Sequence, residues 1–538
     1  MSASILLIIS LLALGTGYLI YGRSLSRRYE LNDSQPTPAH THKDGVDYVP
    51  TKLPVLLGHH FSSIAGAAPI IGPIVAAVFG WVAVAVWILL GSIFIGGVHD
   101  FSALVASVRH GGKTIGEVIE EHVGTAGKRL FLAFAWFLVV LVIAVFAHAV
   151  ANVFVKVPST ASSSFFFIFV AMAFGMSIYR WKIPLWISSI IGLVLLVVCV
   201  ILGLQVPFIL SFNTWKIILF IYAFFAATMP VWILLQPRDY LSSFLLYTLL
   251  IAGVVGIFYA SPKIVAPAFT EFQTDLGTMF PILFVTVACG AISGFHSLVS
   301  AGTTAKQLNK ETDARPIAYG SMLIEGLLSI IALITAVTIL NSDYEGIMKE
   351  GGPIAVFSAG IGSFISRLGI PEDAGVTFAA LAISAFALTT LDTATRLGRF
   401  MFQEYFEGTK AQKLMSDNRY VGTVATIACA TYLTFTGTRD ALWPLFGSAN
   451  QLLASLTLLA VTIWLSKLGK KNNFLKIPMI FMFCVTITAL GFMVYKNIIS
   501  GDIPLVILSL VLLGVAIILV SRAKAVSSQI KSAKETKF

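Results

Sequence analysis

Apolar runs recur along nearly the whole chain and are separated by short polar stretches. A hydropathy window of about 19 residues divides them into about fifteen segments, each close to the roughly 20 residues that a helix needs to cross a bilayer. The second segment covers residues 54–79, the seventh 215–235 and the ninth 280–300. The polar stretches between segments are too short to form hydrophobic cores of their own. The pattern therefore predicts an all-α polytopic membrane protein with about fifteen transmembrane helices.

Composition and charge agree with this prediction. The 538 residues are 57% hydrophobic and 12% charged, with a mean hydropathy of +0.88, which excludes a soluble globular protein. Arg23, Arg27 and Arg28 follow the first segment and place its C-terminal end in the cytoplasm. If successive segments cross the membrane in alternating directions after the first, the loops on the cytoplasmic side hold 29 of the 36 Lys and Arg residues. We therefore expect an outside N-terminus, a cytoplasmic C-terminus and the lipid bilayer as partner, whereas the dispersed basic residues give no nucleic-acid surface.

The stretch GHHFSSIAGAAPIIGP, residues 58–73, is unusually polar and irregular for a membrane segment. Gly66 loosens a helix, and Pro69 and Pro73 each remove a backbone donor. We predict that the helix breaks in this stretch. Because unpaired backbone groups cost several kcal/mol in lipid, such a break survives only where protein or a polar cavity satisfies it. The break is therefore a predicted binding site near the middle of the membrane, and its side chains with polar groups are His59, His60, Ser62 and Ser63.

Ionisable side chains inside predicted spans are functional candidates because burying a charge in lipid is costly. They are His59, His60, His99, Asp100, His148, His296, Glu325 and Asp392. For Asp100 and Glu325, a snorkelling or interhelical hydrogen-bonded role is an equally good interpretation. For His59 and His60 the alternative is a neutral histidine hydrogen-bonded between helices.

Three further motifs place polar residues where apolar ones are expected. SGFHSLVSAGTT, residues 293–304, carries Ser293, Ser297 and Ser300 at helical spacing beside His296. In LTTLDTATRLGRF, Asp392 and Arg396 are four residues apart, which favours a structural ion pair within one helix. WPLFGSANQLLA contains Asn450 and Gln451, whose buried amides need partners from protein or water.

Other chemistries find little support in the residues. Cys199, Cys289, Cys429 and Cys484 lie in apolar segments without CxxC spacing, which favours small core residues. His40 and His42 form a His-x-His pattern, but two histidines alone are a weak signal for a metal site. We predict no metal site, no catalytic residue and no cofactor. An intramembrane hydrolase is a weak alternative, since His296 and Ser297 are adjacent and point apart on a helix. The sequence contains no GxxxxGK[ST] motif, so we expect the energy for transport to come from an ion gradient or a partner.

Five motifs in order make the chain resemble the carbon starvation protein A family of bacterial peptide or pyruvate transporters. They are GHHFSSIAGAAPIIGP, QPRDY at residues 236–240, SGFHSLVSAGTT followed by AKQL, LDTATRLGR, and WPLFGSANQLLA. The resemblance covers nearly the whole chain. It implies a bacterial inner-membrane location and a core similar to the leucine-transporter-type 5+5 inverted repeat, whose two broken helices enclose a midplane site.

That architecture implies a division of the chain into an N-terminal helix and loop (1–53), a ten-helix core (54–400) and a C-terminal four-helix region (401–538). The core repeats are expected at about 54–206 and 215–400, so the second broken helix is expected in the seventh segment, at Met229 and Pro230. The ninth segment then corresponds to the eighth core helix. By this resemblance, Ser293 and Ser297 hold a coupling cation together with carbonyls of Ala65 and Gly66, with His296 beside them.

Together these observations predict an ion-coupled symporter that imports a small carboxylate-bearing nutrient, pyruvate or peptides, by alternating access. The substrate-binding candidates are His59, His60, Ser62, Ser63, Gly66, Met229 and Asn450. Histidine changes charge near neutral pH, but hydroxyl groups suit sodium equally well, so the coupling ion is H+ or Na+. A passive channel is the alternative, although the sequence shows no symmetric charged rings or repeated pore loops.

Overall fold

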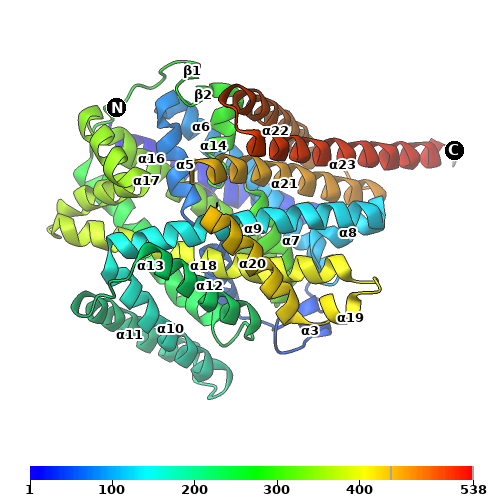
Figure 1. Ribbon diagram of the computed structural model, residues 1–538, viewed down its shortest axis with the longest axis horizontal. Coiled ribbons are helices and arrows are strands. Elements are labelled where there is room, and N and C mark those ends of the chain that lie inside the picture. The colour runs from blue at the N-terminus through cyan, green and yellow to red at the C-terminus, as the bar shows by residue number, and fades with distance from the viewer. Residues whose placement is uncertain (437–438, 536–538) are drawn as a thin grey trace.

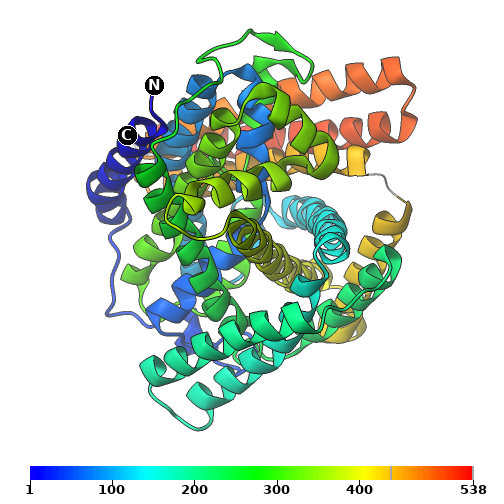
Figure 2. The same cartoon turned by 90° about the vertical axis from the view of Figure 1, so that its left-hand side faces the viewer.

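The computed structural model describes residues 1–436 and 439–535, and this part of the chain is almost entirely helical (Figure 1). Two long helices, α9 (Thr125–Lys156) and α18 (Glu372–Phe406), pack against each other. Figure 2 shows them nearly end-on in the middle of the molecule, in cyan and yellow. Leu, Val, Phe and Ala occupy most buried positions of α9, so this helix is apolar on every side and belongs to the core.

The first half of the chain contains thirteen α-helices within the described residues. Their bounds are α1 Ala3–Thr16, α2 Gly22–Tyr29, α3 Pro38–Thr41, α4 Leu53–Ile64, α5 Ala68–Ala76, α6 Trp81–Gly91, α7 Gly97–Arg109, α8 Ile115–Val123, α9, α10 Pro158–Tyr179, α11 Leu185–Gln205, α12 Phe212–Thr228 and α13 Leu235–Ala260. π-helical turns, η1 (Gly17–Tyr21) and η3 (Ser92–Gly96), join α1 to α2 and α6 to α7, and a 3₁₀ turn, η2 (Ala77–Phe79), follows α5.

The second half begins with a two-stranded antiparallel hairpin, β1 (Gln273–Thr274) and β2 (Gly277–Thr278). The helices that follow are α14 Met279–Thr286, α15 Gly294–Gly302, α16 Ser321–Thr338, α17 Asn341–Ser366, α18, α19 Gln412–Met415, α20 Arg419–Thr436, α21 Arg439–Lys467, α22 Asn473–Ser500 and α23 Ile503–Glu535. Short turns η4 (Thr304–Lys306), η5 (Glu311–Asp313) and the π-helical η6 (Arg315–Gly320) connect α15 to α16. The α22–α23 pair extends to one side in Figure 1.

The number of long spanning helices is lower than the fifteen predicted. Within the described residues ten helices are long and apolar enough to cross a membrane, and the bent α4–α5 pair makes eleven. The apolar helices Phe212–Thr228 and Leu505–Ser521 are shorter, and the ninth predicted segment is divided into α14 and α15. The twelfth predicted segment ends at residue 437, which lies outside the described residues. A hydropathy window measures only the length of an apolar run. It therefore cannot distinguish a continuous helix from two half-helices.

The helix breaks inside the stretch 58–73. α4 ends at Ile64, α5 begins at Ala68, and the two axes differ by 43°. Pro69 lies in the first turn of α5, where its missing N–H is harmless. Pro73 lies within α5 and does not end it. The carbonyl of Pro69, which would otherwise bond the residue at 73, accepts a hydrogen bond from Ser329 Oγ at 2.9 Å.

A second break lies at residues 287–293, between α14 and α15. The prediction that the seventh segment contains this break is wrong, because α12 ends at Thr228 and a turn leads directly into α13. Trp87 Nε1 donates to the carbonyl of Val287 at 3.0 Å, and Gln451 Nε2 donates to the carbonyl of Ile292 at 3.3 Å. Side chains from neighbouring helices thus satisfy the unwound backbone, as burial requires.

The two breaks lie close together. A Cβ placed on Gly72 of α5 would meet the carbonyl oxygen of Thr286, the last residue of α14, at 2.5 Å. A Cβ on Gly290 would meet Ser329 Oγ at 2.0 Å, and the same hydroxyl bonds Pro69. Ser329 of α16 is therefore in contact with both broken helices, and glycine is required where their backbones approach.

Candidate functional site

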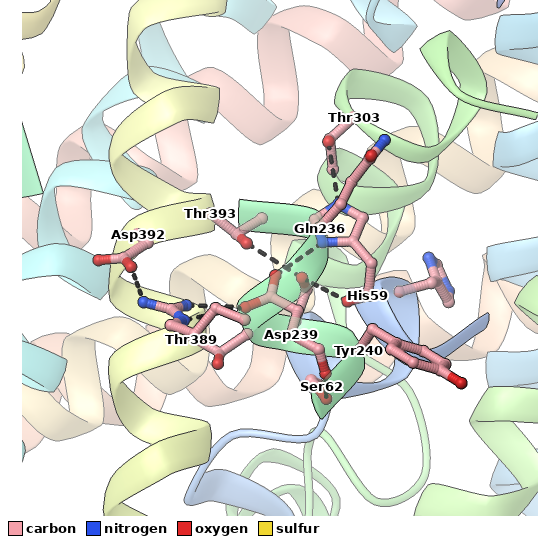
Figure 3. Close-up of polar contacts among 12 residues, drawn as sticks. His59, Ser62, Gln236, Asp239, Tyr240, Thr303, Thr389, Asp392 and Thr393 are labelled. Carbon is pink, nitrogen blue, oxygen red and sulfur yellow. Dashed lines mark hydrogen bonds and ion pairs between the residues drawn. The ribbon is translucent and has the colours of Figure 1, made fainter. Parts of the chain in front are cut away.

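A buried network of charges joins the first half-helix to the core (Figure 3). His59 of α4 donates from Nδ1 to Asp239 Oδ2 at 2.7 Å, and Arg238 Nη2 donates to Asp239 Oδ1 at 2.8 Å. Arg238 Nη1 also contacts Asp392 of α18, whose Oδ2 accepts a bond from Tyr222 at 2.7 Å. We call His59, Arg238, Asp239 and Asp392 the α4–α13–α18 network. It connects three helices at the level of the first break.

The charges in this network do not cancel when His59 is neutral. Arg238 contributes one positive charge, whereas Asp239 and Asp392 contribute two negative charges, and all of these side chains are at most 2% exposed. A buried unbalanced charge is costly, and a partner that supplies the missing charge removes that cost. A proton on His59 supplies it, because His59 already donates to Asp239. Of the four side chains in the network, only the His59 imidazole is of a type that commonly changes between a neutral and a positive form.

A second buried network lies at the other half-helix. Asp100 of α7 accepts hydrogen bonds from His99 Nδ1 at 2.8 Å and from His296 Nδ1 at 3.0 Å. His296 Nε2 lies 3.3 Å from Glu325 Oε2 of α16. We call these four residues the α7–α15–α16 network. It contains two carboxyl groups and neither Lys nor Arg, so only histidine protonation or a shared proton balances its charge.

Half-helix α15 connects the two networks. It carries His296 near its start, and Thr303 and Thr304 follow its end. His59 Nε2 lies 3.3 Å from Thr303 Oγ1, and His60 Nδ1 lies 2.8 Å from Thr304 Oγ1. A shift of α4 against α15 therefore changes the contacts of His59 and His60, and α15 also carries His296 of the second network.

The hydroxyl groups next to the first break come from α18. Ser63 Oγ lies 3.0 Å from Thr393 Oγ1, and Thr390 Oγ1 donates to the carbonyl of Ser63 at 3.2 Å. A Cβ on Gly66 would meet Thr390 Oγ1 at 2.9 Å. Ser62 Oγ donates to the carbonyl of Asp239 at 3.0 Å. Helix α18 therefore lies beside the first break. The sequence analysis predicted the ninth segment at this position.

Ser293, Ser297 and Asn450 belong to the second break. Asn450 Oδ1 accepts bonds from Phe295 N at 2.8 Å and from Ser293 Oγ at 3.2 Å, so this amide from α21 caps the start of α15. Ser297 Oγ lies 3.0 Å from Thr457 Oγ1, also on α21. Ser293 and Ser297 thus have hydrogen-bond partners on α21, and their predicted role at a cation site with Ala65 and Gly66 stays a prediction.

Met229 and Pro230 come directly after α12 and are not part of either break. They follow α12 at its predicted cytoplasmic end, where the carbonyls of Ala226 and Met229 accept hydrogen bonds from Arg396 Nη2. The sequence suggested a break here because small residues precede a proline, but the proline only ends the helix, as proline commonly does.

A cavity of about 200 Å³ opens on the side predicted to be outside and reaches Ile71 of α5. α9, α17 and α18 form its other walls. Most of its lining is apolar, and the polar lining residues include His148, Asn152 and Lys156. An apolar cavity with one ammonium group suits a small molecule that carries a carboxylate.

The profile of the family described as "Carbon starvation protein CstA" matches residues 2–349 and 344–489. The chain belongs to the CstA family. It is therefore a multi-pass membrane protein of a transporter family and not an enzyme.

Curated relatives in the CstA family cover most of this chain. The peptide transporter CstA of Bacillus subtilis is 34% identical over 549 residues, which is 93% of this chain and 91% of the relative. The pyruvate/proton symporter BtsT of Escherichia coli is 31% identical over 565 residues, which is 87% of this chain and 78% of the relative. Among solved structures, a manganese transporter of Eremococcus coleocola aligns with 91% of this chain and 99% of its own, at 12% identity and a TM-score of 0.47.

The predicted ion pair between Asp392 and Arg396 is wrong for this CstA-family chain. Asp392 contacts Arg238, whereas Arg396 Nη1 donates to Asp47 Oδ1 at 2.6 Å. Arg399 Nη2 also donates to both carboxylate oxygens of Asp47, each at 2.8 Å. Residues 392 and 396 lie on one helix as predicted, but each finds a nearer partner on another segment. Asp47 thereby ties the loop before α4 to the C-terminal part of α18.

The pKa of Asp47 reflects this contact. Burial opposes its ionisation, but the guanidinium groups of Arg399 and Arg396 outweigh burial and lower the pKa to about 2. A lowered pKa stabilises the folded state at pH values above the unfolded value of about 3.9, and that stabilisation is lost only as the pH falls toward 2. The contact is therefore intact throughout the physiological range.

Asp47→Asn is expected to lower the free energy of unfolding by about 2 kcal/mol, since charged hydrogen bonds are lost. The midpoint of thermal unfolding in detergent measures this, and Asp44→Asn in the same loop is the control. The difference from wild type should be the same from pH 5 to pH 8. A difference that grows or vanishes within that interval contradicts the assignment.

Several site residues were missed by sequence reasoning. Hydropathy places Arg238 just beyond the seventh segment, in a loop, but it is buried in α13, and Asp239 follows it. The QPRDY motif was the available signal, because adjacent opposite charges at the edge of an apolar segment indicate a buried pair. Tyr222, Thr390 and Ser329 gave no such signal, since their roles depend only on helix packing.

Proposed function

We propose that the chain is a proton-coupled secondary transporter that imports a small carboxylate-bearing nutrient, pyruvate or a peptide, across the bacterial cytoplasmic membrane. The observation that carries this proposal is the charge of the α4–α13–α18 network, which lacks one positive charge when His59 is neutral. The names of the relatives, peptide transporter and pyruvate/proton symporter, support the substrate class and the ion.

The order of elements supports an inverted repeat in a different register from the one predicted. The first repeat would run from α4 to α13 and the second from α14 to α21, each beginning with a broken helix. Each broken helix is followed by a helix with a π-helical turn, η3 in the first repeat and η6 in the second. The α10–α11 hairpin is then an insertion, and α21 belongs to the core although it lies beyond residue 400.

Contacts between distant segments support the predicted orientation in the membrane. Ser2 pairs with Lys263, and both were expected outside. Thr51 pairs with Leu308, and both were expected in the cytoplasm. The cavity at Lys156 then faces outside, and the contact between Asp47 and Arg399 closes the cytoplasmic side.

In this mechanism, substrate enters the cavity beside α5 and its carboxylate is attracted by Lys156. A proton on His59 balances the α4–α13–α18 network and permits α4 to move against α13 and α18 without exposing an unpaired charge. Movement of α4 pulls on Thr303 and Thr304, and so changes the environment of His296. Proton binding and the change in access are thereby linked through one half-helix.

Uptake of labelled pyruvate and dipeptides into proteoliposomes tests the proposal, with each ion gradient imposed separately. We expect an inward proton gradient to drive accumulation and a sodium gradient to have no effect. The hydroxyl cluster of Ser63, Thr390 and Thr393 is the candidate cation site if sodium alone drives uptake. Accumulation that follows sodium and ignores pH contradicts the proposal.

His59→Gln separates coupling from binding. Glutamine keeps a donor near Asp239 but cannot carry the proton, so we expect exchange of labelled for unlabelled substrate to persist while proton-driven accumulation is lost. His40→Gln, on the exposed part of the first loop, is the matched control. A passive channel, the alternative from the sequence, shows no accelerated exchange when unlabelled substrate is present inside.

A further inference from the structure

Three potential metal ligands meet where α7 turns into α8. They are His110 at the end of α7, and Glu121 and His122 in the last turn of α8. One donor atom from each lies within 4.8 Å of the donor atoms of the others. The cluster lies outside both charge networks and outside the cavity at α5. No sequence signal indicated it, because residues 110 and 121 are eleven positions apart.

The local sequence explains why these residues meet. Gly111 and Gly112 both have φ of +73°, which permits the reversal of the chain after His110. Thr114 then caps α8 by accepting a bond from Gly116 N, and Gly124 ends the helix. The buried positions of α8 recur at helical spacing and include His122, so this imidazole is turned inward toward α7.

The distances suit a small divalent cation. His110 Nε2 lies 3.2 Å from Glu121 Oε2, and His122 Nδ1 lies 3.9 Å from Glu121 Oε1. Tetrahedral Zn²⁺ with bonds of about 2.0–2.1 Å separates its ligand atoms by about 3.3 Å. The donor atoms of all three residues lie within 4.8 Å of one another, so side-chain rotation, chiefly of the exposed Glu121, is needed to bring them to coordination distance.

The hydrogen bonds leave the required lone pairs available. His110 Nδ1 donates to the carbonyl of Ala106 at 2.6 Å, which fixes the tautomer and leaves Nε2 as the ligand atom. The His122 side chain is only 3% exposed, and within the described residues neither of its ring nitrogens has a hydrogen-bond partner. An unpartnered buried imidazole is costly, and a metal ion at this position removes that cost.

We propose that His110, Glu121 and His122 form a binding site for a divalent transition metal, Zn²⁺ being the best match. Two histidines and one carboxylate leave a fourth position for water, as in open zinc sites. The Glu121 side chain is 61% exposed, so the ion enters from the solvent on the side predicted to be cytoplasmic. The Lys467 ammonium bonds the carbonyl of Glu121 rather than its carboxylate, which leaves the carboxylate for the metal. The bound ion joins α8 to α7, the helix that carries Asp100.

Calorimetric titration of the purified full-length protein with Zn²⁺ alone tests the site, using a histidine-free affinity tag and prior chelator treatment. We expect one Zn²⁺ per chain with a dissociation constant in the micromolar range or below. Glu121→Gln, at an exposed position that preserves folding, should weaken binding by about tenfold or more. His110→Ala with His122→Ala should abolish it.

The His40 and His42 pair provides the control, since it is the other cluster of histidines outside the spans. His40→Ala with His42→Ala should leave Zn²⁺ binding unchanged. Zn²⁺ should also raise the unfolding temperature of wild type but not of the His110→Ala, His122→Ala variant, as binding to the folded state requires. Equal affinity in wild type and that variant, or loss of binding in the His40, His42 variant, overturns the proposal. Neither outcome bears on proton-coupled transport.

Discussion

Replacement of Arg238 by glutamine is expected to abolish uptake and to lower the free energy of unfolding by about 3 to 5 kcal/mol. The side chain is fully buried between Asp239 and Asp392, and no other cation within the described residues contacts either carboxylate unless His59 is protonated. Removing the guanidinium leaves two buried negative charges on neighbouring helices. Thermal unfolding in detergent and uptake into proteoliposomes measure the two effects.

Removing the charge of Asp392 as well shows whether the loss of stability comes from unpaired charge or from packing. Combining Arg238→Gln with Asp392→Asn deletes one charge of each sign and leaves Asp239 bonded to His59, so we expect most of the stability to return without uptake. Arg180→Gln changes an exposed arginine at the end of α10 and is the matched control. Equal stability of the Arg238 and Arg180 variants would show that the network carries no net charge cost.

Gly66→Leu is expected to reduce uptake by about 100-fold or more, because displacement of about 1 Å at a binding site has that effect. A Cβ on Gly66 would lie 2.8 Å from Phe146 and 2.9 Å from Thr390, so the larger side chain must push α9 and α18 away from the first break. The amount of inserted protein and the rate of uptake are measured in the same membranes.

Two further substitutions make this test specific. Gly66→Ala should give a smaller loss, because the single methyl group meets only side-chain atoms that can shift slightly. Gly491→Leu places the same side chain on α22 where nothing lies within 4 Å, and it should transport as wild type. Wild-type uptake by Gly66→Leu would remove the first break from the transport pathway.

The first break could be predicted from sequence because its causes are local. Glycine and proline interrupt an apolar segment, and backbone chemistry alone makes a continuous helix unfavourable there. The sequence also predicted that Pro73 would interrupt the helix, which it does not do. Pro73 remains within α5 because Ser329, from a helix more than 250 positions away, bonds the carbonyl that Pro73 leaves unpaired.

The second break could not be predicted, because its causes are distant in the sequence. Residues 287–293, VACGAIS, contain no proline, and hydropathy continues through them. Trp87, Asn450 and Gln451 hold this segment open by bonding its backbone or capping the next helix. The predicted repeat places this break in the seventh segment, and the roles predicted for Met229, Ser293 and Ser297 depend on that register and stay predictions.

Ion-pair partners also depend on residues that are distant in the sequence. Helical spacing correctly places Asp392 and Arg396 on neighbouring turns, but such a pair contributes only about 0.2–0.5 kcal/mol. Buried partners on other helices offer more, and so Asp392 contacts Arg238 and Arg396 contacts Asp47. The residues of the site were largely recognisable from their polarity, whereas their pairing depends on the packing of the helices.

The central claim is that substrate and proton move together through the core that contains both breaks. A pH-sensitive dye enclosed in proteoliposomes measures this directly, when pyruvate or a dipeptide is added outside without any imposed gradient. We predict that wild-type vesicles acidify inside as the substrate enters, and that His59→Gln vesicles exchange substrate without acidification. Substrate entry into wild-type vesicles with no change in internal pH would contradict the account.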